Sequence, residues 1–204
     1  MTAPDPAPRR RADGARTRHA ILQAATGLAT TEGLEGLSIG ALADHLGMSK
    51  SGLYAHFGSK EELQLATVAT AEGIFDAEVV APTRAEPTAR GRIEALCERF
   101  LSHLERKVFP GGCFFAAASA ELDTQSGRVR ERVAEFLRGW MGRFERLVGE
   151  AQQAGDLDPA EEPAQLAFEI EAYLLMANNA FVLEGDPLAL ERARRALRRR
   201  LSQR

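Results

Sequence analysis

The sequence predicts an all-α protein. Its 204 residues include 35 alanines and 24 leucines, which favour helices, against only 8 valines, 5 isoleucines and 10 threonines, which favour strands. Serines that can begin a helix and glycines that can end one also alternate along the first third of the chain. With 45% hydrophobic residues and a net charge of −3, the chain can bury a substantial core, which argues against a disordered protein.

The first fifteen residues differ from the rest. Pro4, Pro6 and Pro8 precede three arginines at 9–11, so we expect a disordered basic arm over residues 1–15. This segment contains no apolar run, so it does not read as a secretory signal. The first helix is expected from about residue 16 to residue 32, with Gly33 ending it.

Two short helices and then a longer one are expected next. Ser38 is placed to cap a helix that Gly47 ends, and Ser49 is placed to cap a helix over residues 50–57. Ser59 and Glu62 have the capping-box spacing, which predicts the start of a long fourth helix. Two short helices joined by a glycine turn, over about 38–57, form the helix-turn-helix pattern.

Longer helices are expected after Pro82 and Pro87. Apolar periodicity, together with glycine and proline breaks, places them at about 88–107, 113–122, 127–154, 163–183 and 187–201. We therefore expect an N-terminal three-helix domain over residues 16–62 and a C-terminal helical domain over residues 63–204.

The third helix has a face suited to DNA. Leu53 and Phe57 share its apolar face, whereas the small residues Ser51, Gly52 and Ala55 point outward. Small side chains let a helix approach the major groove closely. Residues 1–60 carry seven basic against five acidic residues, and the remainder of the chain is acidic. A basic head suits a polyanion, although a small helical subdomain with a solvated face would show the same pattern.

Residues 17–63 also resemble a known family. The run Leu53-Tyr54-x-His56-Phe57-x-x-Lys60-x-x-Leu63 is its strongest signature, and this stretch is similar to the N-terminal domain of TetR-type transcriptional repressors. The resemblance implies an all-helical homodimer that binds a palindromic double-stranded DNA operator in the cytoplasm. It also implies that a small-molecule effector in the C-terminal domain releases the DNA.

The resemblance assigns DNA contacts by position. It implies phosphate contacts from the first two helices and from the flanks of the third, and base contacts from the start of the third helix. The ten predicted DNA-binding residues are Thr17, Arg18, Ser38, Ser49, Lys50, Ser51, Gly52, Tyr54, His56 and Lys60. The family more often has Gly followed by Thr or Ser at positions 51–52, so the operator sequence stays open.

The last two expected helices each carry an apolar stripe. Burial within their own domain and a four-helix dimer interface both explain such stripes, and the resemblance favours the interface. The predicted interface residues are Leu166, Ile170, Leu174, Ala177, Phe181, Leu190 and Leu197. Asn178 and Asn179 interrupt the first stripe, either as interface hydrogen bonders or as solvated side chains. A dimer would hold two recognition helices about 34 Å apart, as successive major grooves require.

The middle helices are rich in apolar and aromatic residues. An ordinary core explains any one of them, but their density fits a pocket for a mostly uncharged, aromatic or acyl ligand. The predicted effector-pocket residues are Phe75, Cys97, Phe100, Leu104, Phe114, Trp140, Phe144 and Tyr173. Seven arginines lie between residues 192 and 204, which indicates either a solvated helix face or a second nucleic-acid patch.

Several other functions are disfavoured. The chain has no apolar run of membrane-spanning length, and no C-x-x-C, H-E-x-x-H, P-loop or G-x-S-x-G motif. Cys97 and His103 are six positions apart and cannot share a helix face, so we expect no metal, no cofactor and no catalytic residue. A redox switch between Cys97 and Cys113 is likewise not expected. The rival hypotheses are an all-helical enzyme and a constitutive DNA-organising protein that lacks an effector.

Overall fold

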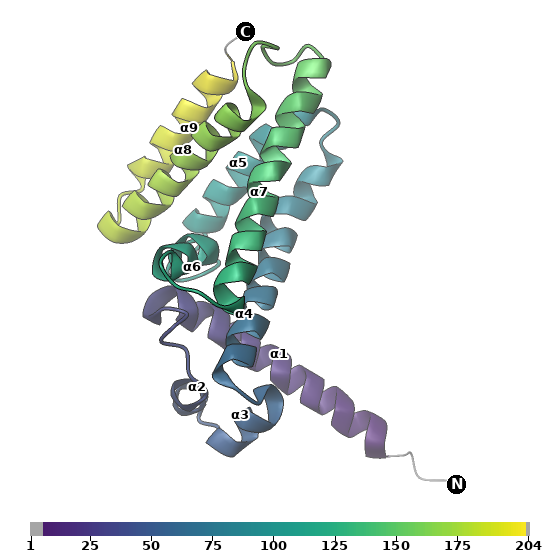
Figure 1. Ribbon diagram of the computed structural model, residues 1–204, viewed down its shortest axis with the longest axis vertical. Coiled ribbons are helices and arrows are strands. Elements are labelled where there is room, and N and C mark those ends of the chain that lie inside the picture. The colour runs from purple at the N-terminus through teal and green to yellow at the C-terminus, as the bar shows by residue number, and fades with distance from the viewer. Residues whose placement is uncertain (1–5, 203–204) are drawn as a thin grey trace.

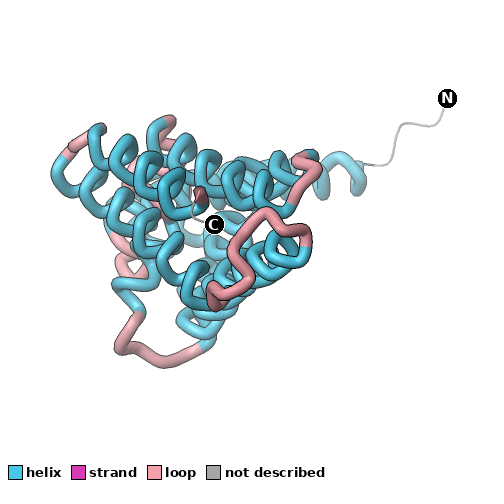
Figure 2. The backbone as a smooth tube through the Cα atoms, turned by 90° about the horizontal axis from the view of Figure 1, so that it is seen from above, coloured by secondary structure: helices cyan, strands magenta, loops and turns pink. Residues whose placement is uncertain are grey.

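The computed structural model describes residues 6–202, with side chains from residue 13 onward, and within that range the chain is helical without a strand (Figures 1 and 2). The α-helices are α1 (Pro6–Glu32), α2 (Ile39–Leu46), α3 (Lys50–Phe57), α4 (Lys60–Phe75), α5 (Ala89–Glu105), α6 (Phe114–Leu122), α7 (Arg128–Gln153), α8 (Pro163–Glu184) and α9 (Leu188–Leu201). A π-helical segment (Asp76–Val80) and a 3₁₀ segment (Ala81–Ala85) follow α4 directly. The all-α prediction is confirmed.

The helices form two groups that α4 connects. Figure 1 shows α2 and α3 at one end of the molecule, with α4 rising from them beside α7 into the larger bundle. Helices α5, α7, α8 and α9 pack against one another in that bundle, and α6 lies between it and α1. The described chain therefore has a small helical head at one end and a larger helical body. The head consists of α1, α2, α3 and the start of α4, and the body consists of the rest of α4 and α5 to α9.

The predicted start of the first helix is wrong. Helix α1 begins at Pro6, so residues 6–15 belong to it instead of to a disordered arm, and residues 1–5 lie outside the described range. The first four N–H groups of a helix have no partner within it. Proline at residues 6 and 8 therefore costs no helical hydrogen bond, which is why these prolines do not delay the helix.

The predicted serine caps are confirmed. The Oγ atoms of Ser38, Ser49 and Ser59 accept hydrogen bonds from backbone amides three residues later, each 3.1 Å long. The capping box at α4 is only half formed, because the Glu62 carboxylate accepts a hydrogen bond from Arg128 of α7 at 2.9 Å. This ion pair ties the head to the body instead of closing the helix end.

The loop before α6 joins the head to the body. The Gly111 amide donates to Thr30 Oγ1 of α1 at 3.0 Å, and a Cβ atom at Gly111 would lie 1.9 Å from the Thr30 carbonyl oxygen. Asn178 of α8 is buried and accepts from the Cys113 amide at 2.9 Å. Both sequence-based interpretations of Asn178 were therefore wrong, because its side chain holds the start of α6 within the same chain, whereas Asn179 is exposed.

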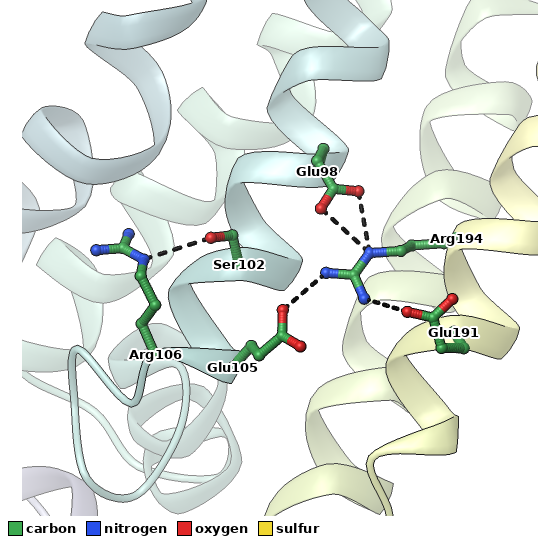
Figure 3. A network of polar contacts seen from close by, with 6 residues as sticks. All are labelled: Glu98, Ser102, Glu105, Arg106, Glu191 and Arg194. Atoms are coloured by element: carbon green, nitrogen blue, oxygen red, sulfur yellow. Dashed lines mark hydrogen bonds and ion pairs between the residues drawn. The ribbon is translucent and has the colours of Figure 1, made fainter.

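Helix α9 is fastened to α5 by ion pairs (Figure 3). The Arg194 side chain is only 12% exposed and bonds to Glu98, Glu105 and Glu191. Arg200 bonds in the same way to Glu161 and Glu169. These arginines already have carboxylate partners, which favours a fixed helix face over a second nucleic-acid patch.

Six of the seven predicted dimer-interface residues are misplaced. Leu166, Ile170, Leu174, Ala177, Leu190 and Leu197 are each at most 3% exposed within the single chain, and only Phe181 is half-buried. Helix α8 carries apolar residues on two sides, and periodicity alone does not say which side faces its own core. Its exposed side forms what we name the outer stripe, made of Phe168, Leu175, Met176, Val182 and Leu183, with Leu188 of α9 beside it.

Helix α8 is also the one helix among residues 6–202 that is long and apolar enough to cross a membrane by length and composition. It packs against α5, α7 and α9 through its buried side. A core helix of a bundle meets the same test, so its composition is explained by this packing and by the outer stripe.

One buried histidine predicts a pH dependence of stability. His103 of α5 lies between the rings of Phe75 and Phe109, with centroids 6.0 and 5.2 Å away, and neither ring nitrogen has a hydrogen-bond partner within the described chain. Burial lowers the pKa of His103 from 6.5 to about 4. The unfolded chain therefore takes up this proton at higher pH than the folded chain does.

We expect the free energy of unfolding contributed by His103 to fall, on the order of 3 kcal/mol, as the pH drops from 6.5 to about 4. Burial raises the pKa of Glu72 and Glu171, which acts in the opposite direction, so the test is a difference between variants. Urea denaturation across this pH window should show a flatter profile for His103→Leu than for the wild type. His45→Gln, at an exposed position on α2, is the control, and equal slopes for His103→Leu and the wild type would contradict the prediction.

Candidate nucleic-acid interface and ligand cavity

Helix α3 presents one face outward at the free end of the head. Leu53 is fully buried and Phe57 is 6% exposed, so these two side chains anchor the helix. Tyr54, on the flank, is 56% exposed. The turn between α2 and α3 passes through Gly47 in the left-handed conformation, with φ at 63°. The geometry is that of a helix-turn-helix whose second helix is accessible to a large partner.

The two predicted contacts on α1 lie beside α3. Thr17 and Arg18 are both exposed, and the Arg18 guanidinium carbon lies 5.0 Å from the centroid of the Phe57 ring. This cation–π contact couples the position of α1 to that of α3. Thr17 Oγ1 donates to the Asp13 carbonyl at 2.9 Å.

The predicted serine contacts also have structural roles. The Oγ atoms of Ser38 and Ser49 each accept a backbone amide, which leaves the hydroxyl hydrogen to donate to a phosphate. A Cβ atom at Gly52 would lie 3.0 Å from Ser49 Oγ. A larger residue at position 52 would therefore crowd the cap that starts α3.

The two predicted lysines sit in weak ion pairs. Lys50 Nζ lies 3.8 Å from Asp44 Oδ2, and Lys60 Nζ lies 3.4 Å from Glu35 Oε2. All four side chains are substantially exposed, and exposed pairs of this kind stabilise a protein by less than about 1 kcal/mol. A phosphate can therefore displace either carboxylate at little cost. With Ser51 exposed and His56 half-buried on α3, all ten predicted residues lie in the head.

A cavity of about 250 Å³ lies inside the body, between α4, α5, α6, α7 and α8. Five aromatic side chains line it: Phe75, Phe100, Phe115, Phe136 and Trp140. Phe75 makes edge-to-face contacts with the other four rings, with centroids 5.1 to 6.3 Å away. The other lining residues are Cys113, Ala116, Ser119, Leu137, Met141, Glu171 and Leu175.

The lining of this cavity differs from the predicted effector pocket. Of the eight predicted residues, Phe75, Phe100 and Trp140 line this cavity, whereas Cys97, Leu104, Phe114, Phe144 and Tyr173 do not. The first four of these are packed in the core, and Tyr173 lies at a groove between α8 and α9. Helical periodicity identifies inward-facing residues, but it does not say which of them border unfilled space.

Sequence reasoning missed the charged member of the cavity. Trp140 Nε1 donates to Glu171 Oε2 at 2.7 Å. Burial raises the pKa of Glu171, and the hydrogen bond from Trp140 only partly opposes this shift. The available signal was an acidic residue directly after the core residue Ile170 in a largely apolar helix.

A second cavity of about 230 Å³ adjoins the first, and both are lined by Phe75, Phe136 and Trp140. It is more polar, because Glu72, Asp76 and Arg143 also line it. Burial lowers the pKa of Arg143, whose Nε atom has no hydrogen-bond partner in the described chain.

The two cysteines are free and buried. Burial raises the pKa of Cys113 to about 11 and also raises the pKa of Cys97. Both thiols are therefore protonated near neutral pH, and protonated thiols are poor nucleophiles and metal ligands. Among residues 6–202, no group of three or more His, Cys, Asp or Glu side chains is arranged to hold a metal ion.

Helix α6 connects the cavity to the head. Phe115, Ala116 and Ser119 line the cavity from this helix. At its other end, the Glu121 carboxylate accepts hydrogen bonds from the amides of Leu34 (2.7 Å) and Glu35 (2.9 Å), in the loop that leads to α2. Helix α4 makes a parallel connection, since it begins in the head and ends at the cavity.

Comparison with known proteins identifies both parts of the chain. Residues 21–67 match the model of the bacterial regulatory proteins of the tetR family, and residues 89–197 match that of the tetracyclin repressor-like C-terminal domain. The chain belongs to the TetR family. The C-terminal match alone spans more than half of the 204 residues.

Solved structures of TetR-family regulators share this fold. A regulator from Chloroflexus aurantiacus J-10-FL is 26% identical, with a TM-score of 0.87 over 94% of this chain and 97% of that one. The regulator SCO4454 from Streptomyces coelicolor is 22% identical (TM-score 0.78, 93% and 95% covered). A crystal structure of AibR in complex with isovaleryl coenzyme A and operator DNA is 23% identical (TM-score 0.72, 88% and 95% covered). No curated protein sequence matches the chain.

Membership of the TetR family settles the class of function. TetR-family proteins are DNA-binding transcriptional regulators and not enzymes, so the predictions of a DNA-binding regulator and of no enzymatic activity are confirmed. The rival hypothesis of an all-helical enzyme is thereby excluded.

The Glu121 contact predicts a local effect on this TetR-family head. Glu121→Ala leaves two amides without their carboxylate partner, which should destabilise the loop by about 3 kcal/mol, because hydrogen bonds to charged groups are worth about 1.5–3 kcal/mol each. Native-state hydrogen exchange should show faster exchange at Leu34 and Glu35. Glu131→Ala, at an exposed position on α7, is the control. Unchanged exchange at both amides would show that the carboxylate does not hold this loop.

Proposed function

We propose that this TetR-family regulator is a repressor that binds a palindromic operator as a homodimer and is released by a small, largely apolar effector. The observation that carries the proposal is that two helices, α4 and α6, each run from the aromatic cavity to the helix-turn-helix head. Because the proposed target is operator DNA, we propose that the protein acts in the cytoplasm.

The head supports binding of a DNA duplex. The start of α3, with Lys50, Ser51 and Gly52, is proposed to read base edges in the major groove. Tyr54 and His56 are proposed to contact phosphates from the two flanks of α3. Lys60 at the start of α4, Thr17 and Arg18 on α1 and Ser38 at the start of α2 are proposed to contact further phosphates. Each of these positions lies in the head, and phosphate contacts of this kind fix the register of a helix in the groove.

The outer stripe on α8 supports a dimer. Leu183 is 85% exposed, Phe168 is 64% exposed and Met176 is 61% exposed, so a single chain leaves a large apolar surface in water. A groove of about 240 Å³ between α8 and α9 adjoins this surface. Exposed apolar patches of this kind mark interfaces, and a twofold partner would bury the same stripe on each copy.

The cavity supports control by a ligand. A molecule that binds in it contacts side chains of α4 and α6, such as Phe75 and Phe115, which pack edge to face at 6.0 Å. Movement of α4 reaches the head at its first residue, Lys60, and movement of α6 reaches the head through the hydrogen bonds of Glu121. The ligand shifts the balance between DNA-binding and released states only if it binds the released state more tightly. The AibR complex, which contains isovaleryl coenzyme A and operator DNA, supports this fold as a host for both kinds of partner.

The experiment that tests the function is selection of bound duplexes from a random DNA library, with the stoichiometry of the winning complex measured by analytical ultracentrifugation. We expect an enriched palindrome bound by one dimer. Binding to every sequence with equal, salt-sensitive affinity would instead indicate a constitutive DNA-organising protein.

Tyr54→Phe and Lys60→Ala should weaken binding to all sequences about equally, because their proposed partners are phosphates.

The dimer has its own test. Leu183→Asp places a charge in the outer stripe and should weaken self-association at least about tenfold, since burying an unpaired charge at an interface is costly. Sedimentation equilibrium measures the change. Gln153→Asp, at an exposed position at the end of α7, should leave the dimer intact. A dimer of Leu183→Asp as strong as that of the wild type would place the interface elsewhere.

A further inference from the structure

We propose that the cavity takes a small lipophilic cation, with the positive charge of an organic ammonium group held beside Glu171 and enclosed by aromatic rings. The inference rests on the proposed effector function and names the chemical class of the effector: a largely apolar molecule that carries one positive charge.

The Glu171 carboxyl group has no charged partner in the cavity. It is the only acidic side chain that lines the cavity, and no Lys, Arg or His lines it within the described chain. The hydrogen bond from Trp140 engages Oε2 but supplies no positive charge. A carboxylate enclosed by apolar walls is costly unless a cation pairs with it. Without a ligand, the Glu171 carboxyl group therefore has no cation beside it, and an ammonium ligand would supply one.

The walls of the cavity are largely aromatic. The five aromatic rings of the cavity come from four helices, and the faces of aromatic rings carry negative electrostatic potential that attracts cations. Phe115 and Phe136 stack with centroids 3.4 Å apart, and Trp140 lies between Phe75 and Phe144 with centroids 5.1 and 4.8 Å away. The same walls and the Glu171 carboxylate would repel an anion.

The neighbouring cavity has a different charge balance and is not the proposed site. Arg143 lines that space together with Glu72 and Asp76. Hydrogen-bonded ion pairs already join Glu72 to Arg132 and Asp76 to Arg84.

In the first cavity, an uncharged apolar ligand would leave Glu171 facing hydrocarbon, without a partner for its charge.

The test compares two probes of the same shape and different charge, benzyltrimethylammonium and its uncharged carbon isostere, neopentylbenzene. Trp140 is the only tryptophan of the chain and lines the cavity, so its fluorescence reports binding at this site. We expect the ammonium to bind the full-length protein at least about tenfold more tightly than the isostere, as expected for ion pairing together with cation–π contacts.

Glu171→Gln keeps the size of the side chain and an oxygen that accepts from Trp140, but removes the charge. It should weaken binding of the ammonium at least about tenfold and leave binding of neopentylbenzene within about twofold. Glu145→Gln, at an exposed position on α7, removes the same charge away from the cavity and should change neither affinity.

Equal binding of the two probes by the wild type, or no binding of either, overturns the inference without requiring any variant to fold. An ammonium preference that survives in Glu171→Gln overturns the role of Glu171. Selection of duplexes with the same preparation separates this result from the proposed function. A protein that selects an operator but shows no charge preference is a regulator with another ligand class. A protein that prefers the ammonium but selects no DNA retains the cavity assignment and loses the regulatory one.

Discussion

The contact between the end of α6 and the loop after α1 is the constraint on which the rest of the structure depends. Glu121 accepts two amides of that loop, and a Cβ atom at Gly33, where φ is +87°, would lie 2.7 Å from its carboxylate oxygen. The loop also bonds to Gln64 of α4, which donates to the Leu34 carbonyl at 2.8 Å. Helices α4 and α6, which both line the cavity, therefore meet the head at one short segment, and neither can shift there without disturbing the start of α2.

Local signals predicted most of the fold correctly. Hydrogen bonds of a serine to the amide three residues ahead, and glycines in the left-handed conformation, depend on neighbouring residues only, so Ser38, Ser49 and Gly47 could be assigned from the sequence. The start of α1 was missed because proline is tolerated in the first turn of a helix as readily as before it.

The way in which the helices pack against one another was less predictable from the sequence. The apolar residues of α8 lie on two sides, and the choice between core and outer stripe depends on where α5, α7 and α9 pack, which periodicity does not contain. The same limit applies to the cavity, where Phe115 lines the space and its neighbour Phe114 does not. Glu171 was overlooked because an acidic residue in a helix normally reaches solvent, whereas this one bonds to Trp140 inside the bundle.

The ion pairs of Arg194 and Arg200 have a consequence for assembly. They fasten α9 to α5, and the end of α9 to α8 and the loop before it, within one chain. The surface that a second copy would meet is therefore already rigid in the separate subunit. The proposed dimer would therefore form by docking of preformed bodies, in which the conformational entropy of folding has been lost beforehand. For the proposed dimer, dilution is therefore expected to separate folded subunits instead of unfolding them.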